Sequence, residues 1–455
     1  MYALGHELAA MPSHKFDLAH MRVLLEALGH PERKFASVLT AGTNGKGSTA
    51  ATLAAILQAS GLKTGLYTSP HLVRINERIQ VNGAAIGDDD FAMLHDFVDR
   101  TAERLVCEKK LPWHPSFFEM LTAMAFEYFA RMTPDIVVLE VGMGGRLDAT
   151  NVVDPRLSII TDISLDHQKF LGNTVREIAR EKAGIIRRGG VVVTLPQSPE
   201  ANAVIGNTIL DLGARAASAV PYVPPVSPGS AEFWEHAAKR STTEDTEVTE
   251  RRRSHPALRY PLQVMGEEIM VESPLLGRHQ LRNIALAIAA AVELRQQWFP
   301  QIAAKTIERG IRETHWPGRF QVLPALDDRP QIVLDVAHNP AGAWALRSAL
   351  SAAYEDRLIT MVFGMMRDKA VSEVAEILFP IAEYVIVTRA NNPRSATPEE
   401  IRAAASRVET HIDLAPDVAS ALAHAHRITG PSGVVVVTGS IYIVGEAMQA
   451  MGLSI

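Results

Sequence analysis

Short runs of apolar residues alternate with segments of helical pattern from early in the chain. Residues 37–42 (SVLTAG) form a continuous apolar run that predicts a strand, and residues 48–61 (STAATLAAILQASG) have the spacing of a helix. Further runs that predict strands before residue 200 are residues 63–70, 135–145, 157–167 and 191–196. Continuous apolar strands that alternate with helices are typical of a mostly parallel sheet covered on both faces.

The alternation is interrupted in the middle of the chain. Residues 220–230 and 239–255 are rich in proline, serine and mixed charge, so we expect an exposed insertion at about residues 225–257. Residues 262–272 alternate around a glycine, which predicts a β-hairpin. Residues 279–297 are apolar nearly all round, which predicts a long buried helix.

The alternation resumes after the segment THWPGRF, in which Pro317 and Gly318 interrupt regular structure and predict a hinge. The later strands are predicted at residues 331–340, 358–366, 384–393 and 433–448. We therefore predict an α/β protein with two domains. An N-terminal P-loop ATPase-type domain with a mostly parallel sheet would cover residues 1–316, and a smaller Rossmann-like domain would cover residues 317–455.

The composition narrows the classes of protein to consider. Of the 455 residues, 47% are hydrophobic and 21% charged, which is enough for packed cores. A formal net charge of −6 argues against nucleic acid or an anionic membrane as partner. Cys107 is the single cysteine, so neither an intrachain disulfide nor a cysteine metal cluster can form. No leader is evident in residues 1–16 and no apolar run reaches the length of a membrane span, so we expect a cytoplasmic protein, and a monomer.

A glycine-rich segment, AGTNGKGST, lies between the first predicted strand and its helix. Only two residues separate Gly42 from Gly45, whereas the general phosphate-loop motif has four. The backbone N–H groups of such a loop and the helix N-terminus attract anions. We expect Lys46 to reach the β- and γ-phosphates of a nucleotide, and Ser48 or Thr49 to bind phosphate or its metal ion. The alternative, a tight turn with an exposed lysine, is disfavoured by the three interleaved glycines.

Two polar residues follow strands at the edge where α/β proteins bind ligands. Glu140 ends the apolar run DIVVLE and could hold Mg²⁺, although an ordinary strand-end charge is the alternative. His167 follows another strand, in DISLDHQ, and is a candidate ligand or acid–base group; a structural loop histidine is the alternative. We reject the segment GMGGRLDA as a dinucleotide fingerprint because Leu147 occupies the position of the third small residue.

Lys182 lies on the apolar face of a predicted helix. Thr174 and Glu177 predict a capping box at the start of this helix. Ile178 and Ile185 lie on the same face as Lys182. A lysine on a buried face tends to lose its proton and become nucleophilic. The alternative is a lysine that extends its amine to solvent.

In the second predicted domain, Asp335 ends the strand run QIVLDVA and is followed by His338, Asn339 and Pro340. Asn339 suits the N-cap of a helix and Pro340 its first position, so this segment could be only a helix start. Arg319, just after the predicted hinge, is placed to reach a nucleotide. None of these residues identifies a reaction alone.

Taken in order, these segments resemble the folylpolyglutamate synthase/dihydrofolate synthase family, within the Mur ligase superfamily. The matching stretches are TAGTNGKGST, GLYTSPHLVRINERI, FFEMLTAMAF, VVLEVGMGGRLDATN, SLDHQKFLG, IAREKAGIIR, WPGRFQ, LDVAHNP and TGSIYIVGE. They extend over nearly the whole chain, and their order and spacing make the match specific. GTNGKGS is this family's own form of the phosphate loop, which accounts for its unusual spacing.

The resemblance implies a reaction. ATP phosphorylates a carboxylate of a pterin-bearing substrate, giving an acyl phosphate and ADP, and the amine of L-glutamate then attacks to form an amide. Dihydropteroate as acceptor gives dihydrofolate, and a reduced folate gains a γ-linked glutamate.

The resemblance also implies roles for single residues, and we expect Lys46, Lys182 and His167 to be catalytic. Ser69 and Glu140 would bind a first Mg²⁺, and His167 a second. Lys182 matches a family lysine that CO₂ carbamylates, which turns an amine into an anion able to support Mg²⁺. The residues implied to bind the triphosphate are Gly42, Thr43, Asn44, Gly45, Lys46, Gly47, Ser48 and Thr49.

Further matches extend the implied site. Asn283, Arg319 and Asp335 match contacts to ATP, and His338 would help to place glutamate or the nucleotide. The residues in stretches implied to line the pterin site are Phe118, Glu119 and Asp148.

Two other functions compete with this interpretation. A peptidoglycan Mur ligase uses the same chemistry on a UDP-sugar, but those enzymes carry a substantial domain before the phosphate loop, where only about forty residues stand here. A nucleotide-binding protein without ligase activity would not need Lys182 or Arg319. The acceptor range, the length of the glutamate chain and a requirement for K⁺ stay open.

Overall fold

The computed structural model describes residues 18–225, 257–325 and 329–453. The predicted polar insertion therefore lies almost wholly outside the described residues. The chain divides into two compact units: the first comprises Met1–Val223, Gln263–Glu267 and Leu281–Ile311, and the second comprises Pro224–Leu262, Glu268–Gln280 and Arg312–Ile455. The domain boundary at residues 316 and 317 stays a prediction.

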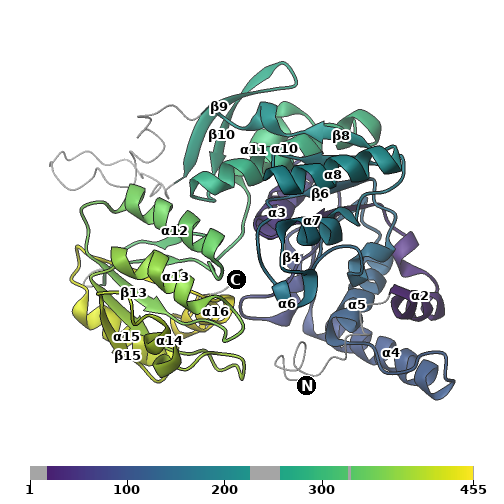
Figure 1. Ribbon diagram of the computed structural model, residues 1–455. Coiled ribbons are helices and arrows are strands. Elements are labelled where there is room, and N and C mark those ends of the chain that lie inside the picture. The colour runs from purple at the N-terminus through teal and green to yellow at the C-terminus, as the bar shows by residue number, and fades with distance from the viewer. Residues whose placement is uncertain (1–17, 226–256, 326–328, 454–455) are drawn as a thin grey trace. The chain divides into compact units, whose positions relative to one another are not determined.

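The first unit is built on an eight-stranded sheet with the strand order β4-β3-β2-β5-β1-β6-β7-β8. Figure 1 labels β4, β6 and β8 of this sheet. Its strands are β1 (Ser37–Ala41), β2 (Thr64–Tyr67), β3 (Ile79–Val81), β4 (Ala84–Ala85), β5 (Ile136–Glu140), β6 (Leu157–Ile160), β7 (Val191–Thr194) and β8 (Arg215–Ser218). β1 pairs in parallel with β5 and β6, whereas β3 runs antiparallel to β2. The sheet is therefore mostly parallel, as the continuous apolar runs predict.

Helices cover both faces of this sheet. The helices of the first unit are α2 (Leu18–Ala27), η1 (Pro31–Arg33), α3 (Lys46–Ala59), η2 (Ile75–Arg78), α4 (Asp88–Cys107), α5 (Phe117–Met132), η3 (Ala149–Val152), α6 (Gln168–Leu171), α7 (Val175–Ala183), α8 (Pro199–Leu212) and η4 (Val220–Tyr222), with almost all of α10 (Arg278–Gln297) and α11 (Ala304–Arg312). One hydrophobic core joins α2, α4, α5, α7 and α8 to the sheet and includes Val137 and Leu139 of β5. Because side chains alternate along a strand, Glu140 faces the opposite side, where α3 packs against β1, β2 and β5.

The long helix and the hairpin predicted from the sequence are both present. Residues 283–291 of α10 are all buried, which confirms the prediction of a buried helix. β9 (Leu258–Val264) and β10 (Glu267–Ser273) pair around Met265 and Gly266, which have φ of 54° and 83°. Two central residues with positive φ are the geometry of a tight two-residue hairpin turn.

The second unit contains a six-stranded sheet with the order β11-β12-β16-β13-β14-β15. Its strands are β11 (Gln321–Leu323), β12 (Gln331–Leu334), β13 (Ile359–Phe363), β14 (Tyr384–Val387), β15 (His411–Leu414) and β16 (Val434–Thr438). Its helices are α12 (Pro340–Ala353), α13 (Val371–Leu378), η6 (Phe379–Ile381), α14 (Pro398–Ala404), α15 (Val418–Ile428) and α16 (Ile441–Ala450). Only β11 pairs antiparallel, so this sheet too is mostly parallel. The α/β class with a second, smaller α/β domain is confirmed. Among the described helices none is long and apolar enough to cross a membrane.

Candidate active site

The glycine-rich segment joins the carboxyl end of β1 to the start of α3. Gly45 is the N-cap of α3, with φ 86°, a conformation that a residue with a Cβ rarely adopts. Lys46 begins the helix, and its Nζ donates to Thr43 O at 3.2 Å. Ser48 and Thr49 are buried in the first turn. The segment has the strand–turn–helix context that a phosphate-binding loop requires.

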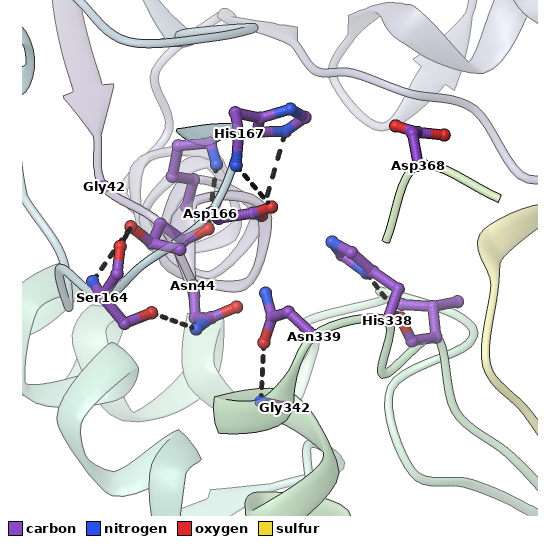
Figure 2. Close-up of polar contacts among 12 residues, drawn as sticks. Gly42, Asn44, Ser164, Asp166, His167, His338, Asn339, Gly342 and Asp368 are labelled. Carbon is purple, nitrogen blue, oxygen red and sulfur yellow. Dashed lines mark hydrogen bonds and ion pairs between the residues drawn. The ribbon is translucent and has the colours of Figure 1, made fainter. Parts of the chain in front are cut away.

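The two residues between Gly42 and Gly45 are engaged with the loop that follows β6. The backbone N–H groups of Thr43 and Asn44 both donate to Asp162 O, at 2.8 and 3.2 Å. Asn44 Nδ2 donates to Ser164 Oγ at 3.3 Å, as Figure 2 shows. Beside it, Thr43 Oγ1 donates to Ser164 O at 3.0 Å. The shortened motif is therefore held by strand-like pairing with residues 162–164, a role that its sequence does not reveal.

Lys182 of α7 (Val175–Ala183) contacts this loop directly. Its Nζ donates to Gly42 O at 2.7 Å, and only 4% of the residue is exposed. Burial, together with the nearby charge of Lys46, lowers the pKa of Lys182 from 10.5 to about 7, although Asp166 and Asp148 act in the opposite direction. The predicted capping box of Thr174 and Glu177 starts α7, and Lys182 is on its buried face. The alternative of an amine extended to solvent is excluded.

The segment GMGGR, for which the sequence suggested no role, packs against the C-terminal turn of α7. A Cβ added at Gly145 would lie 2.7 Å from Glu181 O, and Arg146 N donates to the same oxygen at 2.8 Å. A Cβ added at Gly184 would lie 2.4 Å from the Arg146 side chain. The glycines let the two backbones approach closely and so fix the position of Lys182. The segment leads into η3, not into a long helix, which agrees with the rejection of a dinucleotide fingerprint.

Glu140 is buried at the end of β5, and Thr40 of β1 is its register partner. Ser69 N donates to Glu140 Oε2 at 3.2 Å, so the two predicted metal ligands are neighbours. Two residues after Ser69, His71 Nδ1 accepts from Nε of the buried Arg78 at 3.0 Å. Burial, together with the charge of Arg78, lowers the pKa of His71 to about 3, so this imidazole is a neutral acceptor at physiological pH.

His167 follows the loop after β6 and is the N-cap of α6, with φ 48°. Its backbone N donates to Asp166 Oδ1 at 2.8 Å, and its Nε2 lies 3.8 Å from Asp166 Oδ2 (Figure 2). About a third of the imidazole is exposed. Because Asp166 also influences the pKa of Lys182, this loop and Lys182 belong to one cluster of charges.

The three residues expected at the pterin site all shape local structure. The Phe118 ring packs on Gly142, where an added Cβ would lie 2.5 Å from it. Glu119 completes a capping box with Ser116 at the start of α5. Asp148 accepts from Met143 N at 2.9 Å and from Thr150 N at 3.0 Å, and burial raises its pKa. Contact of these side chains with a pterin stays a prediction.

Asn283 of α10 lies against the N-cap of α3. A Cβ added at Gly45 would lie 2.1 Å from Asn283 Oδ1, although the two residues are far apart in sequence. The first unit thus brings together Lys46, Lys182 and Asn283 with the loop of residues 162–167. The sequence predicted no role for Asp162 or Ser164 of this loop, although Asp162 follows an apolar run and Ser164 begins the matching stretch SLDHQKFLG.

The predicted residues of the second unit form a separate group around Asp335. This buried carboxylate accepts from Phe320 N and Ala337 N, each at 2.8 Å. Burial raises the pKa of Asp335, and the charge of Arg319 acts against this shift. His338 Nδ1 lies 2.8 Å from Val336 O.

Asn339 is the N-cap of α12, as predicted: its Oδ1 accepts from Gly342 N at 2.8 Å, and Pro340 is the first residue of the helix (Figure 2). The segment AHNP is therefore a helix start, and a role of His338 in binding stays a prediction.

Comparison with known proteins places this arrangement in a family. The Mur ligase middle domain matches residues 118–291, and the Mur ligase glutamate ligase domain matches residues 318–441. The dihydrofolate synthase/folylpolyglutamate synthase of Bacillus subtilis is 33% identical over 448 residues, covering 96% of this chain and 95% of its own. The chain belongs to the folylpolyglutamate synthase/dihydrofolate synthase family of Mur ligases. It is accordingly an ATP-dependent ligase that adds glutamate, and the two competing functions are set aside.

Two other relatives in this family agree over the whole length. The folylpolyglutamate synthase of Lacticaseibacillus casei is 34% identical, covering 95% of this chain and 94% of its own. The solved structure of Mycobacterium tuberculosis folylpolyglutamate synthase, complexed with ADP and AMPPCP, superposes with a TM-score of 0.82 at 30% identity and covers 96% of each chain. Relatives of nearly equal identity thus carry names for one or for two activities, so similarity leaves the acceptor of this chain open.

Proposed function

We propose that this chain joins the amine of L-glutamate to a carboxylate of dihydropteroate or of a reduced folate, at the carboxyl edge of the first unit's sheet. The observation that carries the proposal is the position of Lys182, whose buried amine lies 2.7 Å from the carbonyl of Gly42. Residues 42–49 bind the triphosphate of ATP, with Lys46 neutralising charge on the β- and γ-phosphates.

The residues at this edge fit Mg²⁺. Ser69 and Glu140 offer hard oxygen ligands and are neighbours, since Ser69 N donates to Glu140 Oε2. Mg²⁺ is usually held by one or two carboxylates together with substrate phosphates and water. The described residues contain no group of three or more His, Cys, Asp and Glu side chains that could hold a metal ion. Mg²⁺ bound here would neutralise charge between the phosphates. His167, with Asp166 beside it, is the proposed position of a second ion.

Lys182 is proposed to carry a carbamate. Its neutral amine adds to CO₂, one proton is released, and the product is an anion next to the phosphate loop. A pKa of about 7 leaves a large neutral fraction at physiological pH, and the Gly42 carbonyl orients the amine. Bicarbonate should therefore raise the activity of enzyme prepared in CO₂-free buffer, and the Lys182→Met variant should not respond.

The second unit supplies Arg319, Asp335 and His338. Asp335 accepts from the backbone N–H groups of Phe320 and Ala337, so it is proposed to position the neighbouring Arg319 for a contact with ATP. Asn283 is proposed to contact the nucleotide from beside Gly45. Phe118, Glu119 and Asp148 are proposed to line the pterin site.

The decisive assay offers the purified chain ATP, Mg²⁺ and L-glutamate, with dihydropteroate or tetrahydrofolate in separate reactions. ADP release and product mass are followed together, and parallel reactions in KCl and NaCl test for K⁺ dependence. Glutamate addition to both acceptors identifies two activities in one site, and addition to one names the acceptor. A folded, ATP-binding protein that adds glutamate to neither would contradict the proposal.

A cytoplasmic, monomeric enzyme is part of the same proposal. The single cysteine and the acidic net charge support it. Light scattering of the purified chain measures its oligomeric state.

A further inference from the structure

Arg282, the residue before Asn283 on α10, joins three separate segments of the first unit. Its guanidinium binds the carboxylate of Asp162 in a forked arrangement, with Nε at 2.9 and 3.1 Å from the two oxygens and Nη2 at 2.6 Å from Oδ1. The same Nη2 donates to Pro196 O, in the segment after β7, at 2.9 Å. Such two-point contacts fix direction as well as distance.

Asp162 connects this contact to the phosphate loop. While its side chain accepts from Arg282, its backbone oxygen accepts from both Thr43 N and Asn44 N. One residue therefore carries the arginine contact on its side chain and the pairing with the loop on its main chain. A change in the position of Asp162 must move the two residues between Gly42 and Gly45.

Gln197 holds the same segment from the side of β7. Its Nε2 donates to Thr161 O at 3.2 Å, and its Oε1 accepts from Ile163 N at 3.1 Å. The residues before and after Asp162 are thus fixed by Gln197, and Asp162 itself by Arg282. A Cβ added at Gly42 would lie 1.8 Å from Thr161 Oγ1, so the phosphate loop packs directly on this segment.

We propose that Arg282 is a positioning residue for ATP, which sets the phosphate loop in its binding conformation through Asp162. This inference rests on the proposed nucleotide site at residues 42–49. Arg282 does not need to touch the nucleotide, because its effect passes through the backbone oxygen of Asp162.

The partial exposure of the Arg282–Asp162 ion pair indicates that its main effect is on nucleotide binding and not on the stability of the fold. The side chains of Arg282 and Asp162 are 32% and 38% exposed, and partly exposed ion pairs contribute little to the stability of a fold. Loss of the pair should therefore change nucleotide binding far more than the melting temperature.

The test compares Arg282→Met, Arg282→Lys and Asp162→Asn with the parent chain. We expect the Kd for ADP and the KM for ATP to rise about tenfold in Arg282→Met, the size expected when a charged hydrogen bond is lost. The kcat at saturating ATP and the KM for the acceptor should stay within about twofold, because the Arg282–Asp162 contact acts on Thr43 and Asn44 and on none of the residues expected to be catalytic. Arg282→Lys keeps the charge but not the forked contact, so its Kd for ADP should lie between those of the parent chain and Arg282→Met.

A matched control is Arg259→Met. Arg259 also donates through two nitrogens to one carboxylate, Glu272, but on the β9–β10 hairpin. This variant should leave the Kd for ADP unchanged. Combining Arg282→Met with Asp162→Asn should add little to the effect of either change, since both break one contact.

Two results would overturn the inference. The first is an unchanged Kd for ADP in Arg282→Met. The second is a lower melting temperature and a lower kcat, together with a rise in all KM values, in both Arg282→Met and Arg282→Lys. That result would identify a merely structural residue. Because ADP binding is measured without ligation, a parent chain that adds no glutamate contradicts the proposed function yet still tests Arg282.

Discussion

The two units each bury an ionisable group at the carboxyl edge of a parallel sheet, but they support it differently. In the first unit, Lys182 donates to a carbonyl 140 residues away in sequence, and burial lowers its pKa to about 7. In the second, Asp335 accepts from two backbone N–H groups, 15 and 2 residues away. The carboxylate is thus held by its own neighbourhood, whereas the amine depends on the assembled unit. We therefore expect removal of the Lys182 amine to stabilise the protein and removal of the Asp335 carboxylate to destabilise it.

The largest expected effect is on catalysis by the first unit. Lys182→Met should lower the rate of glutamate ligation by about a thousandfold or more, since it removes the carbamate that is proposed to support Mg²⁺ beside the phosphate loop. Binding of ADP should be kept, because the backbone pairing of Thr43 and Asn44 with Asp162 still holds the phosphate loop. Steady-state assays and calorimetry measure the two effects. Lys305→Met, which alters an exposed lysine of α11, is the control and should be inert; a fully active Lys182→Met would refute the catalytic role.

The next effect is a gain of stability in the same variant. In CO₂-free buffer the unfolded chain keeps the Lys182 proton up to a pH near 10.5, whereas the folded chain releases it near 7. Between these values the unfolded state binds more protons, so the stability of the parent rises with pH. Lys182→Met should therefore be more stable by up to about 5 kcal/mol at about pH 6, and this gain should shrink as the pH rises toward 10.5.

Urea unfolding of both chains across this pH range measures the difference in the free energy of unfolding. A gain that does not depend on pH would show that titration of Lys182 is not its cause. Added bicarbonate should reduce the extra stability of Lys182→Met over the parent, because carbamate formation would stabilise the folded parent chain.

Asp335→Asn should act in the opposite direction. An asparagine offers one acceptor oxygen, so either Phe320 N or Ala337 N loses its partner, at a cost of about 1–3 kcal/mol for an unsatisfied buried donor. The same urea experiment at neutral pH measures this loss. Asp356→Asn, at an exposed position of the second unit, should change nothing. A stabilised Asp335→Asn would mean that relief of the buried charge outweighs the lost acceptor, and the two units would then behave alike.

The smallest expected effect concerns the helix cap of the second unit. Asn339→Ala should lower the free energy of unfolding by about 1 kcal/mol, because Gly342 N loses its acceptor, whereas Asn339→Ser should be nearly neutral. Thr174→Ala removes the corresponding cap of α7 in the first unit and should cost a similar amount. Urea unfolding measures both costs, and an unchanged free energy of unfolding in either alanine variant would contradict the role of its cap.

Much of the architecture was predictable because it depends on near neighbours. Strand and helix periodicity predicted the two α/β units, the hairpin around Gly266 and the buried α10. The caps formed by Thr174 and Asn339 follow from side chains that reach backbone groups three residues away. The buried face of α7 likewise placed Lys182 inside the protein.

The contacts that make the candidate site were decided by the tertiary structure alone. Pairing of Thr43 and Asn44 with Asp162, the approach of Asn283 to Gly45 and the packing of Gly145 on α7 all join distant segments. No pattern within one segment contains this information, since it arises when strands and helices pack at close range. The sequence therefore determined which elements form and which faces are buried. Packing decided which buried groups meet, and hence the pKa of Lys182 and the geometry of the phosphate loop.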